Sequence, residues 1–421
     1  MSMTIVEKIL ARSSGQTTVA PGDLVVVVAE TTVMIDTSFY PSQWRPILKV
    51  HDPSKVVVVL DHRVPAPDRT FARMHQIARE FANQFGIERF HDVGRDQGIS
   101  HVIAAEHGYA VPGTVFVCSD SHTGSAGALN CVARGVGTAD LVHAVTTGNA
   151  WYQVYPTIRY DLTGRLGPGV YAKDLFLNLA ETYGDHAGFN VEYGGPALAH
   201  LNVDARRTLT TMGTELNAEF SIFEPDQALV DYVRQRTSQP FEEQYPDPDA
   251  AYDRRVTIDL SQIEPLVARP DAVIRNVSPV SEEAGVAIQQ AFIGSCANGN
   301  FDDLAAAAAV LKGQRVASGV RLLITPGSQA VYRQALKAGI IETLVEAGAV
   351  VTNATCGACG GGHMGVLAPG ETCITASTRN FKGRMGDPSA RIYMASPATV
   401  AASAVRGTIT HPGELLGKGA A

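Results

Sequence analysis

Reactive side chains in this sequence come directly after short apolar segments. Asp61 and His62 follow VVVVL, Asp120 and His122 follow VFVCS, and Cys296 follows AFIGS. Apolar, β-branched segments of this length are typical of buried strands, and open α/β sheets bind ligands beyond the carboxyl ends of their strands. The pattern therefore predicts that these loops converge on one cleft outside the carboxyl ends of the strands.

Cysteines form a second reactive group. Cys356 and Cys359 make a C-x-x-C pair inside the small-residue segment CGACGGG, and Cys296 is the expected third thiol. One distant cysteine plus such a pair suits a 4Fe-4S cluster that leaves one iron without a protein ligand, which is the open position that Lewis-acid catalysis needs. A structural zinc site and a redox pair are the alternatives, although structural zinc usually takes four protein ligands.

Histidines with nearby acids form the third group. This group has three members: Asp61 with His62, Asp120 with His122, and His101 in the segment QGISH. A carboxylate orients an imidazole and raises its proton affinity, as protonation of a departing hydroxide requires. Each histidine taken singly is more often structural, but together at strand ends they indicate acid–base chemistry.

Two arginines supply positive charge in a chain that is acidic as a whole. Arg379 and Arg384 lie in the segment TRNFKGR, and the guanidinium fork binds carboxylates with two hydrogen bonds. The alternative is a basic surface loop with ordinary ion pairs. The remaining thiols, Cys118, Cys131 and Cys373, are expected in the core, because cysteine packs there as a small apolar residue.

The elements that position these residues follow an α/β pattern. The chain has 421 residues, of which 45% are hydrophobic and 18% charged, so it can bury one large core or several ordinary ones. Helices are expected at 301–312 and at 328–347, where Gly348 would end the second. Buried strands are expected at 24–28, 56–60, 115–118, 291–293, 322–324 and 392–394.

A polar segment divides the sequence. Residues 238–255 (SQPFEEQYPDPDAAYDRR) are rich in proline and acids and lack an apolar period, which indicates a surface linker. The expected organisation is an N-terminal region at 1–237 that carries the acid–histidine motifs and a C-terminal region at 256–421 that carries the cluster cysteines.

Net charge excludes some classes of partner. The formal charge is −8 and no long basic segment occurs, so we expect neither nucleic acid nor a membrane as a partner. The N-terminal residues lack the apolar stretch of a signal peptide, and apolar segments are only as long as strands, so a cytoplasmic protein is expected.

The ordered motifs resemble those of the aconitase family, and more narrowly the large subunits of split isopropylmalate isomerases and homoaconitases. The resemblance extends from residue 7 to residue 409. Its markers include LDHRVP at 60–65, CSDSHTGSAGAL at 118–129, NVEYGGPAL at 190–198, FIGSCANGNFDDL at 292–304, CGACGGG at 356–362, RNFKGRMG at 379–386 and ASPATVAASAVRG at 395–407.

The resemblance implies an aconitase-like α/β fold, with several three-layer α/β/α domains around a central cluster cleft. It implies that Cys296, Cys356 and Cys359 hold a 4Fe-4S cluster. It also implies three acid–histidine pairs, with His62 protonating the leaving hydroxide, and a set of substrate-binding residues. The pairs are Asp61 with His62, Asp120 with His101 and Glu192 with His122; the substrate-binding residues are Ser121, Arg379 and Arg384.

The activity implied is that of a hydro-lyase that reversibly dehydrates or isomerises a small 2-hydroxy di- or tricarboxylic acid, with isopropylmalate as the first expectation. Alternatives are homoaconitase and (de)hydratases of methylmalate, dimethylmalate or maleate. A more distant alternative is an iron-sensing nucleic-acid-binding protein, which the acidic composition disfavours. The swivelling domain of full-length aconitases, with its serine base, is absent from the motifs, so a separate small subunit is expected to carry it.

Two positions depart from the family pattern. Thr378 stands where the family commonly has asparagine, and Ala297 stands where it commonly has threonine. Neither change removes an expected ligand or acid. The Thr378 change bears on the surroundings of the cluster and on the exact substrate.

Overall fold

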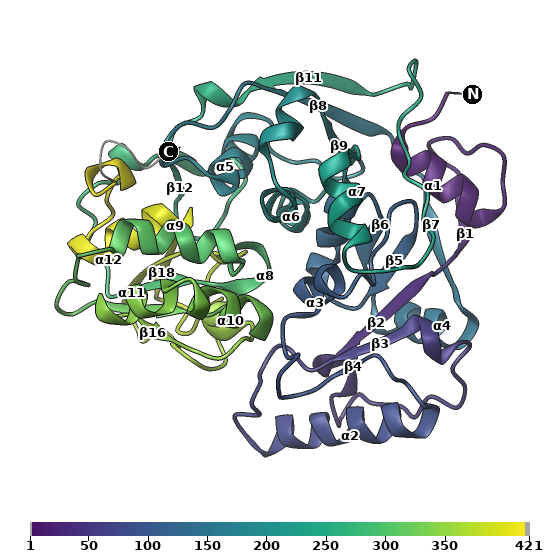
Figure 1. Cartoon of the computed structure of the whole chain (residues 1–421), viewed down its shortest axis with the longest axis horizontal. Coiled ribbons are helices and arrows are strands. Elements are labelled where there is room, and N and C mark those ends of the chain that lie inside the picture. The colour runs from purple at the N-terminus through teal and green to yellow at the C-terminus, as the bar shows by residue number, and fades with distance from the viewer. Residues whose placement is uncertain (1, 417–421) are drawn as a thin grey trace. The chain divides into compact units, whose positions relative to one another are not determined.

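The computed structural model describes residues 2–416, and contacts within the chain divide it into two compact units. The first unit comprises residues up to Val93, 100–164 and 186–258. The second comprises 94–99, 165–185 and the described residues from Asp259 onward. Each unit contains a parallel or mainly parallel sheet with helices (Figure 1), so the expected α/β class is confirmed.

A five-stranded sheet lies at the centre of the first unit. Its order is β4-β3-β2-β5-β6, and all neighbouring strands are parallel. Their carboxyl ends therefore share one edge of the sheet, which is where α/β proteins bind ligands. The strands are β2 (Thr31–Ile35), β3 (Val56–Val59), β4 (Phe90–His91), β5 (Val115–Cys118) and β6 (Val132–Gly135).

Helices cover both faces of this sheet. Val58 of β3 belongs to an apolar cluster with side chains of α2 (Arg69–Phe85) and α4 (Thr138–Thr147). The preceding residue of the strand, Val57, belongs to the opposite cluster with α3 (Ser100–Glu106) and α7 (Gln227–Arg234). Successive strand residues point to opposite faces, so the sheet is the middle layer of an α/β/α sandwich.

The first unit also contains a smaller sheet, ordered β10-β9-β8-β11, and a two-stranded antiparallel ribbon of β1 with β7. β1 was expected to be buried, but its residues alternate between exposed and buried because only one face of the ribbon is covered. The elements are α1 (Ile5–Ser14), α6 (Val203–Met212), β1 (Leu24–Val28), β7 (Asn149–Gln153), β8 (Thr157–Thr163), β9 (Asn190–Gly194), β10 (Ser221–Phe223) and β11 (Arg254–Asp259).

The second unit contains a seven-stranded sheet, ordered β13-β12-β18-β17-β14-β15-β16. The strands from β18 to β16 are parallel, and β12 is antiparallel to both of its neighbours. The strands are β12 (Leu266–Ala268), β13 (Val277–Pro279), β14 (Gln290–Ile293), β15 (Arg321–Ile324), β16 (Val350–Val351), β17 (Thr372–Thr375) and β18 (Arg391–Ala395).

The two faces of this seven-stranded sheet are covered differently. Ala291 and Ile293 of β14 pack with helices, whereas Phe292 between them packs with side chains of the loops at 358–390, including Cys359. The helices of this unit are α5 (Ala172–Thr182), α8 (Ser295–Asn298), α9 (Phe301–Leu311), α10 (Gln329–Lys337), α11 (Ile340–Glu346) and α12 (Pro397–Arg406). The loop-covered face carries the cysteine motifs.

One expected helix is two helices. The segment 328–347 is interrupted at Gly339, whose φ of 72° lies in the left-handed region that glycine adopts without steric cost. The single apolar face expected for it is therefore wrong, since Leu336 is 55% exposed while Leu344 is fully buried.

The boundary segment 238–255 has little regular structure but belongs to the first unit. The backbone N–H of Gln244 donates to Asn130 Oδ1 at 2.8 Å, and Asn130 Nδ2 donates back to the carbonyl of Gln244 at 3.0 Å. Asp247 bonds the backbone N–H of Met3 and the ammonium of Lys8. These long-range polar contacts hold a segment of low apolar content against the unit, so it differs from the linker that its composition predicted.

No helix among residues 2–416 is long and apolar enough to cross a membrane.

Candidate active site

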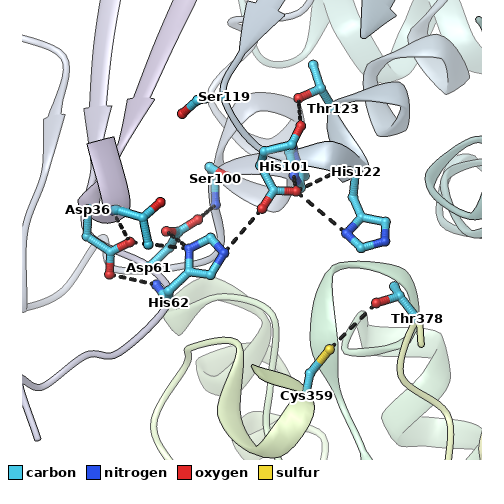
Figure 2. A network of polar contacts seen from close by, with 12 residues as sticks. Asp36, Asp61, His62, Ser100, His101, Ser119, His122, Thr123, Cys359 and Thr378 are labelled. Atoms are coloured by element: carbon cyan, nitrogen blue, oxygen red, sulfur yellow. Dashed lines mark hydrogen bonds and ion pairs between the residues drawn. The ribbon is translucent and has the colours of Figure 1, made fainter. Parts of the chain in front are cut away.

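Three neighbouring strands of the first sheet end in acidic residues. Asp36 follows β2, Asp61 and His62 follow β3 after one residue, and Asp120 follows β5 after one residue. β3 and β5 flank β2 on either side, so their carboxyl ends bring these side chains together (Figure 2). The sequence rule for strand ends located this group correctly, except that it did not single out Asp36.

His62 lies among three carboxylates. Its Nδ1 is 2.7 Å from Asp61 Oδ1 and 3.3 Å from Asp36 Oδ1, while its Nε2 is 3.2 Å from Asp120 Oδ2. Both ring nitrogens face carboxylate oxygens, so both donate hydrogen bonds when the ring is doubly protonated. The side chain is 27% exposed, which leaves the ring reachable by a substrate. Carboxylates on both sides of an imidazole favour its charged form.

Asp61 and Asp36 are themselves held by backbone groups. Asp61 Oδ2 accepts from the N–H of Ser100 at 2.9 Å, and Asp36 Oδ2 accepts from the N–H groups of His62 and Arg63 at 3.0 and 3.3 Å. Burial alone would raise the pKa of Asp36, but hydrogen bonds from His62 and His75 outweigh it and hold the pKa well below its usual range. Asp36 therefore stays ionised beside His62.

Asp120 contacts all three histidines. Its Oδ1 lies 2.9 Å from His101 Nε2 and 3.5 Å from His122 Nδ1, and it accepts the backbone N–H of His122 at 2.7 Å. Burial opposes ionisation, but hydrogen bonds from His101, His122 and His62 hold the pKa of Asp120 well below its ordinary value. One carboxylate thus aligns three imidazoles. The expected pair Asp61–His62 is present (Figure 2), and so is the expected pair Asp120–His101.

The expected pairing of Glu192 with His122 is wrong. His122 Nε2 lies 2.9 Å from Glu215 Oε1 instead. Glu215 belongs to the turn Gly213–Leu216 that follows α6, and it is 93 residues from His122 in the sequence. No local pattern signals a contact over that distance, so sequence reasoning missed it.

Glu192 has a different environment. It lies in β9 directly opposite Arg159 of β8, and its Oε1 is 2.7 Å from the Arg159 guanidinium. Tyr252 and the backbone N–H of Ile5 also donate to it. Burial raises the pKa of Glu192 above its ordinary value, although these donors oppose the shift. The side chain is fully buried in an internal network, which accounts for its absence from the histidine group.

Ser121 lies at the start of a 3-10 segment, Ser121–Leu129, immediately after Asp120. Its carbonyl accepts from the hydroxyl of Thr214 at 2.8 Å. It also lines a cavity of about 460 Å³ together with Thr214, Asn217 and Arg134. That volume is in the range of small-molecule sites, and the lining is polar.

The cysteine motifs of the second unit meet at shared neighbours. Cys296 is in α8, just after β14, Cys356 immediately precedes the 3-10 turn Gly357–Gly360, and Cys359 lies within that turn. A Cβ added at Gly294 would lie 2.8 Å from the Thr325 carbonyl, and one added at Gly357 would lie 2.6 Å from the Thr325 hydroxyl. Both loops therefore pack closely on the same residue, and glycine permits the approach.

The sulfur of Cys359 has polar neighbours that suit a thiolate. Arg384 Nη2 donates to it at 3.5 Å. The Thr378 hydroxyl lies 3.6 Å from the same sulfur (Figure 2). Cys296 and Cys359 are buried and Cys356 is half-buried. Thiolate ligands in a glycine-rich pocket with donors to sulfur are the surroundings that iron–sulfur clusters take, so these residues fit such a group. Thr378 retains a hydroxyl within reach of sulfur despite its departure from the family pattern.

Arg379 and Arg384 are both half-buried in the loop after β17. The neighbouring Asn380 anchors this loop through its Nδ2, which donates to the carbonyls of Arg269 and Ala272 at 2.7 and 2.9 Å. The loop therefore holds one guanidinium against Cys359.

The structure describes all six cysteines, and none is in a disulfide. Cys118, Cys131 and Cys373 are buried as expected. Burial raises the pKa of Cys118 and of Cys131 to about 12 and raises that of Cys373 as well. These three thiols stay protonated, which suits core packing and not ligation.

Comparison with known proteins identifies the class. The model of the aconitase family (aconitate hydratase) matches residues 42–407. The chain belongs to the aconitase family, as its motifs implied.

Relatives within the family narrow the similarity. The chain is 52% identical over 416 residues to the 3-isopropylmalate dehydratase large subunit of Mycolicibacterium smegmatis, covering 99% of this chain and 98% of the relative. It is 43% identical to the probable 3-isopropylmalate dehydratase large subunit of Methanothermobacter thermautotrophicus, covering 99% of this chain and 100% of that relative. Among solved structures it aligns with the holo-form of Thermococcus kodakaraensis aconitase X, with a TM-score of 0.48 and 12% identity. The alignment covers 87% of this chain and 88% of the other.

Proposed function

We propose that this chain is the large subunit of a 4Fe-4S hydro-lyase that dehydrates and isomerises 3-isopropylmalate. The observation that carries the proposal is full-length similarity to 3-isopropylmalate dehydratase large subunits, at 52% identity for one of them. The grouped acids and histidines of the first unit and the cysteine pocket of the second supply the chemistry that such a reaction needs.

Cys296, Cys356 and Cys359 are the proposed cluster ligands. Three thiolates for a four-iron cluster leave one iron open, and when bound the cluster supplies Lewis acidity at the substrate hydroxyl. Arg384 donates to the Cys359 sulfur at 3.5 Å, which stabilises negative charge on that ligand.

His62 is the proposed acid. Loss of hydroxide from the hydroxy acid requires a proton on the departing oxygen, and the doubly protonated ring of His62 carries one. Asp61 and Asp36 on one side and Asp120 on the other favour that charged form, because an opposite charge within about 4–6 Å stabilises it. The partial exposure of the ring lets it reach a substrate.

Asp120, with His101 and His122, is the proposed positioning group for the departing oxygen. Glu215 takes the role first expected of Glu192, because it is the carboxylate that contacts His122. Ser121, Arg379 and Arg384 are proposed to bind the substrate carboxylates, the arginines through paired hydrogen bonds.

A separate small subunit is proposed to supply the base. Removing a proton from the carbon beside a carboxylate needs a positioned base, and the residues assigned above are already committed to the acid, the cluster and the substrate charge. The relatives are named large subunits, which supports a partner for this chain.

The test is a substrate panel assayed with a small subunit. The anaerobically reconstituted chain and its partner are mixed with 3-isopropylmalate, homocitrate, citrate and citramalate (2-methylmalate), and formation of the unsaturated acid is followed by ultraviolet absorbance. We expect the highest kcat/KM with 3-isopropylmalate. Preference for another acid would refute the substrate, and no turnover of any acid by a cluster-loaded complex would refute the function.

A further inference from the structure

The ribbon of β1 and β7 presents an exposed apolar face. Leu24 is 70% exposed, Val26 64%, Trp151 56% and Val28 41%. In the pairing register Val26 lies opposite Trp151, Leu24 opposite Gln153, and Val28 opposite Asn149. These six side chains, the ribbon face, therefore form one surface of two rows, and their alternate neighbours Val25, Val27, Ala150 and Tyr152 pack into the core.

The composition of the ribbon face is unusual for this chain. A net charge of −8 is spread over the molecule, yet none of the six side chains is charged. The four apolar ones expose on the order of 400 Å², which is the size of the largest apolar patches on monomers, and such patches often mark interaction sites. Trp151 Nε1 donates to Asp140, which lies outside the six, at 3.3 Å, and this bond orients the indole.

The position of the ribbon face separates it from the acid–histidine group. β1 leads into β2 through Ala29 and Glu30 (Figure 1), and Glu30 bonds the backbone of Val115, the first residue of β5. The face therefore adjoins the amino ends of the central strands. Asp36 and Asp120 follow their carboxyl ends, roughly 13–17 Å further along strands of four or five residues. An interface confined to the ribbon face would not include the reacting groups.

We propose that the ribbon face is a docking surface for a second copy of this chain, related by a two-fold axis. A two-fold contact places the same patch against itself, so an uncharged patch is what two acidic copies can bring together without repulsion. Two such faces bury about 800 Å² of apolar surface, and the polar rim brings the contact toward the roughly 1,200–2,000 Å² of stable interfaces. Trp151, near the middle of the face, is the anchor.

The partner of the proposed activity does not fit this face as well. A small subunit that supplies a base must contact the carboxyl ends of the central strands, whereas the ribbon adjoins their amino ends. The geometry therefore favours a copy of the chain over a catalytic partner at the ribbon.

The experiment measures mass in solution by light scattering on the full chain, for which one copy is 44.7 kDa. We expect twice that mass at micromolar concentration. Trp151→Glu should weaken association more than about 30-fold, because it removes the anchor and buries a charge. Val26→Thr keeps the β-branched shape and should weaken association about tenfold. This milder variant still tests the ribbon face if Trp151→Glu fails to fold.

Leu48→Glu is the matched control, because Leu48 is 91% exposed but lies outside the ribbon. It should keep the mass of the parent, and circular dichroism should be the same for all the variants. A parent chain that stays at 44.7 kDa, or a Trp151→Glu variant that still dimerises as tightly as the parent, overturns the proposal. So does an intact dimer in which Trp151→Glu instead abolishes binding of the small subunit.

Discussion

Replacing Asp120 by asparagine tests the histidine arrangement most sharply. The amide has the same shape as the carboxylate but carries no charge, and its NH₂ group cannot accept a hydrogen bond. Asp120 contacts His101 at 2.9 Å, His62 at 3.2 Å and the backbone N–H of His122 at 2.7 Å. The variant therefore keeps the side chain in place while removing what favours the protonated rings.

The magnitude follows from those contacts. Hydrogen bonds to a charged group contribute about 1.5–3 kcal/mol and neutral ones about 0.5–1.5 kcal/mol. Each hydrogen bond of Asp120 is therefore weakened by roughly 1 kcal/mol when the carboxylate becomes an amide. Three such losses amount to about 3 kcal/mol, or on the order of 100-fold in rate at 1.4 kcal/mol per tenfold change, within the range of general acid catalysis.

The assay is kcat for dehydration of 3-isopropylmalate by the reconstituted complex, measured beside iron content. We expect kcat of Asp120→Asn to fall about 100-fold with iron unchanged. Asp92→Asn is the control, because Asp92 also follows a strand of the same sheet but pairs with Arg79. Equal losses in both variants, or an unchanged kcat in Asp120→Asn, would refute the reasoning.

Three further predictions concern single side chains. Glu215→Gln should lower kcat at least tenfold with little change in unfolding temperature. Glu192→Gln breaks a buried ion pair and should lower the unfolding temperature by at least about 5 °C. If calorimetry and rate assays instead show the loss of kcat in Glu192→Gln and the loss of stability in Glu215→Gln, the catalytic role returns to Glu192. Cys356→Ser should abolish stable cluster assembly while Cys373→Ala retains it, as iron and sulfide analysis of anaerobic protein would report. Burial raises the pKa of Asp174 to about 7, so the folded state holds a proton that the unfolded state has lost above about pH 4, and this contribution to stability declines as the pH rises through 7. The unfolding temperature of Asp174→Asn relative to the parent should therefore rise between pH 5 and pH 8, and a constant difference would contradict the assignment.

Much of the site could be predicted because it follows a local rule. Asp61, His62 and Asp120 each come just after an apolar strand, and parallel strands place such residues on one edge. The same rule would have found Asp36, which follows the strand TTVMI. Recognition of the family motifs supplied the cysteine ligand set, whose spacing alone left zinc and redox alternatives open.

What could not be predicted depends on non-local contacts. Glu215 meets His122 across 93 residues, and Glu192 is drawn away by Arg159, its neighbour on the adjacent strand. Packing of the turn after α6 decides the first contact, and strand order and register decide the second, so neither can be read from a single segment. The helix expected at 328–347 failed for a local reason, because Gly339 adopts a left-handed conformation that helical periodicity does not reveal.

The central claim is that this chain is a cluster-bearing large subunit that needs a partner for turnover. The most direct measurement titrates a small subunit into a fixed amount of the anaerobically reconstituted chain and follows dehydration of 3-isopropylmalate. We expect negligible turnover without the partner and a rate that saturates at one partner for each chain. Full activity of the chain alone, or no activity at saturating partner with the cluster intact, would contradict it.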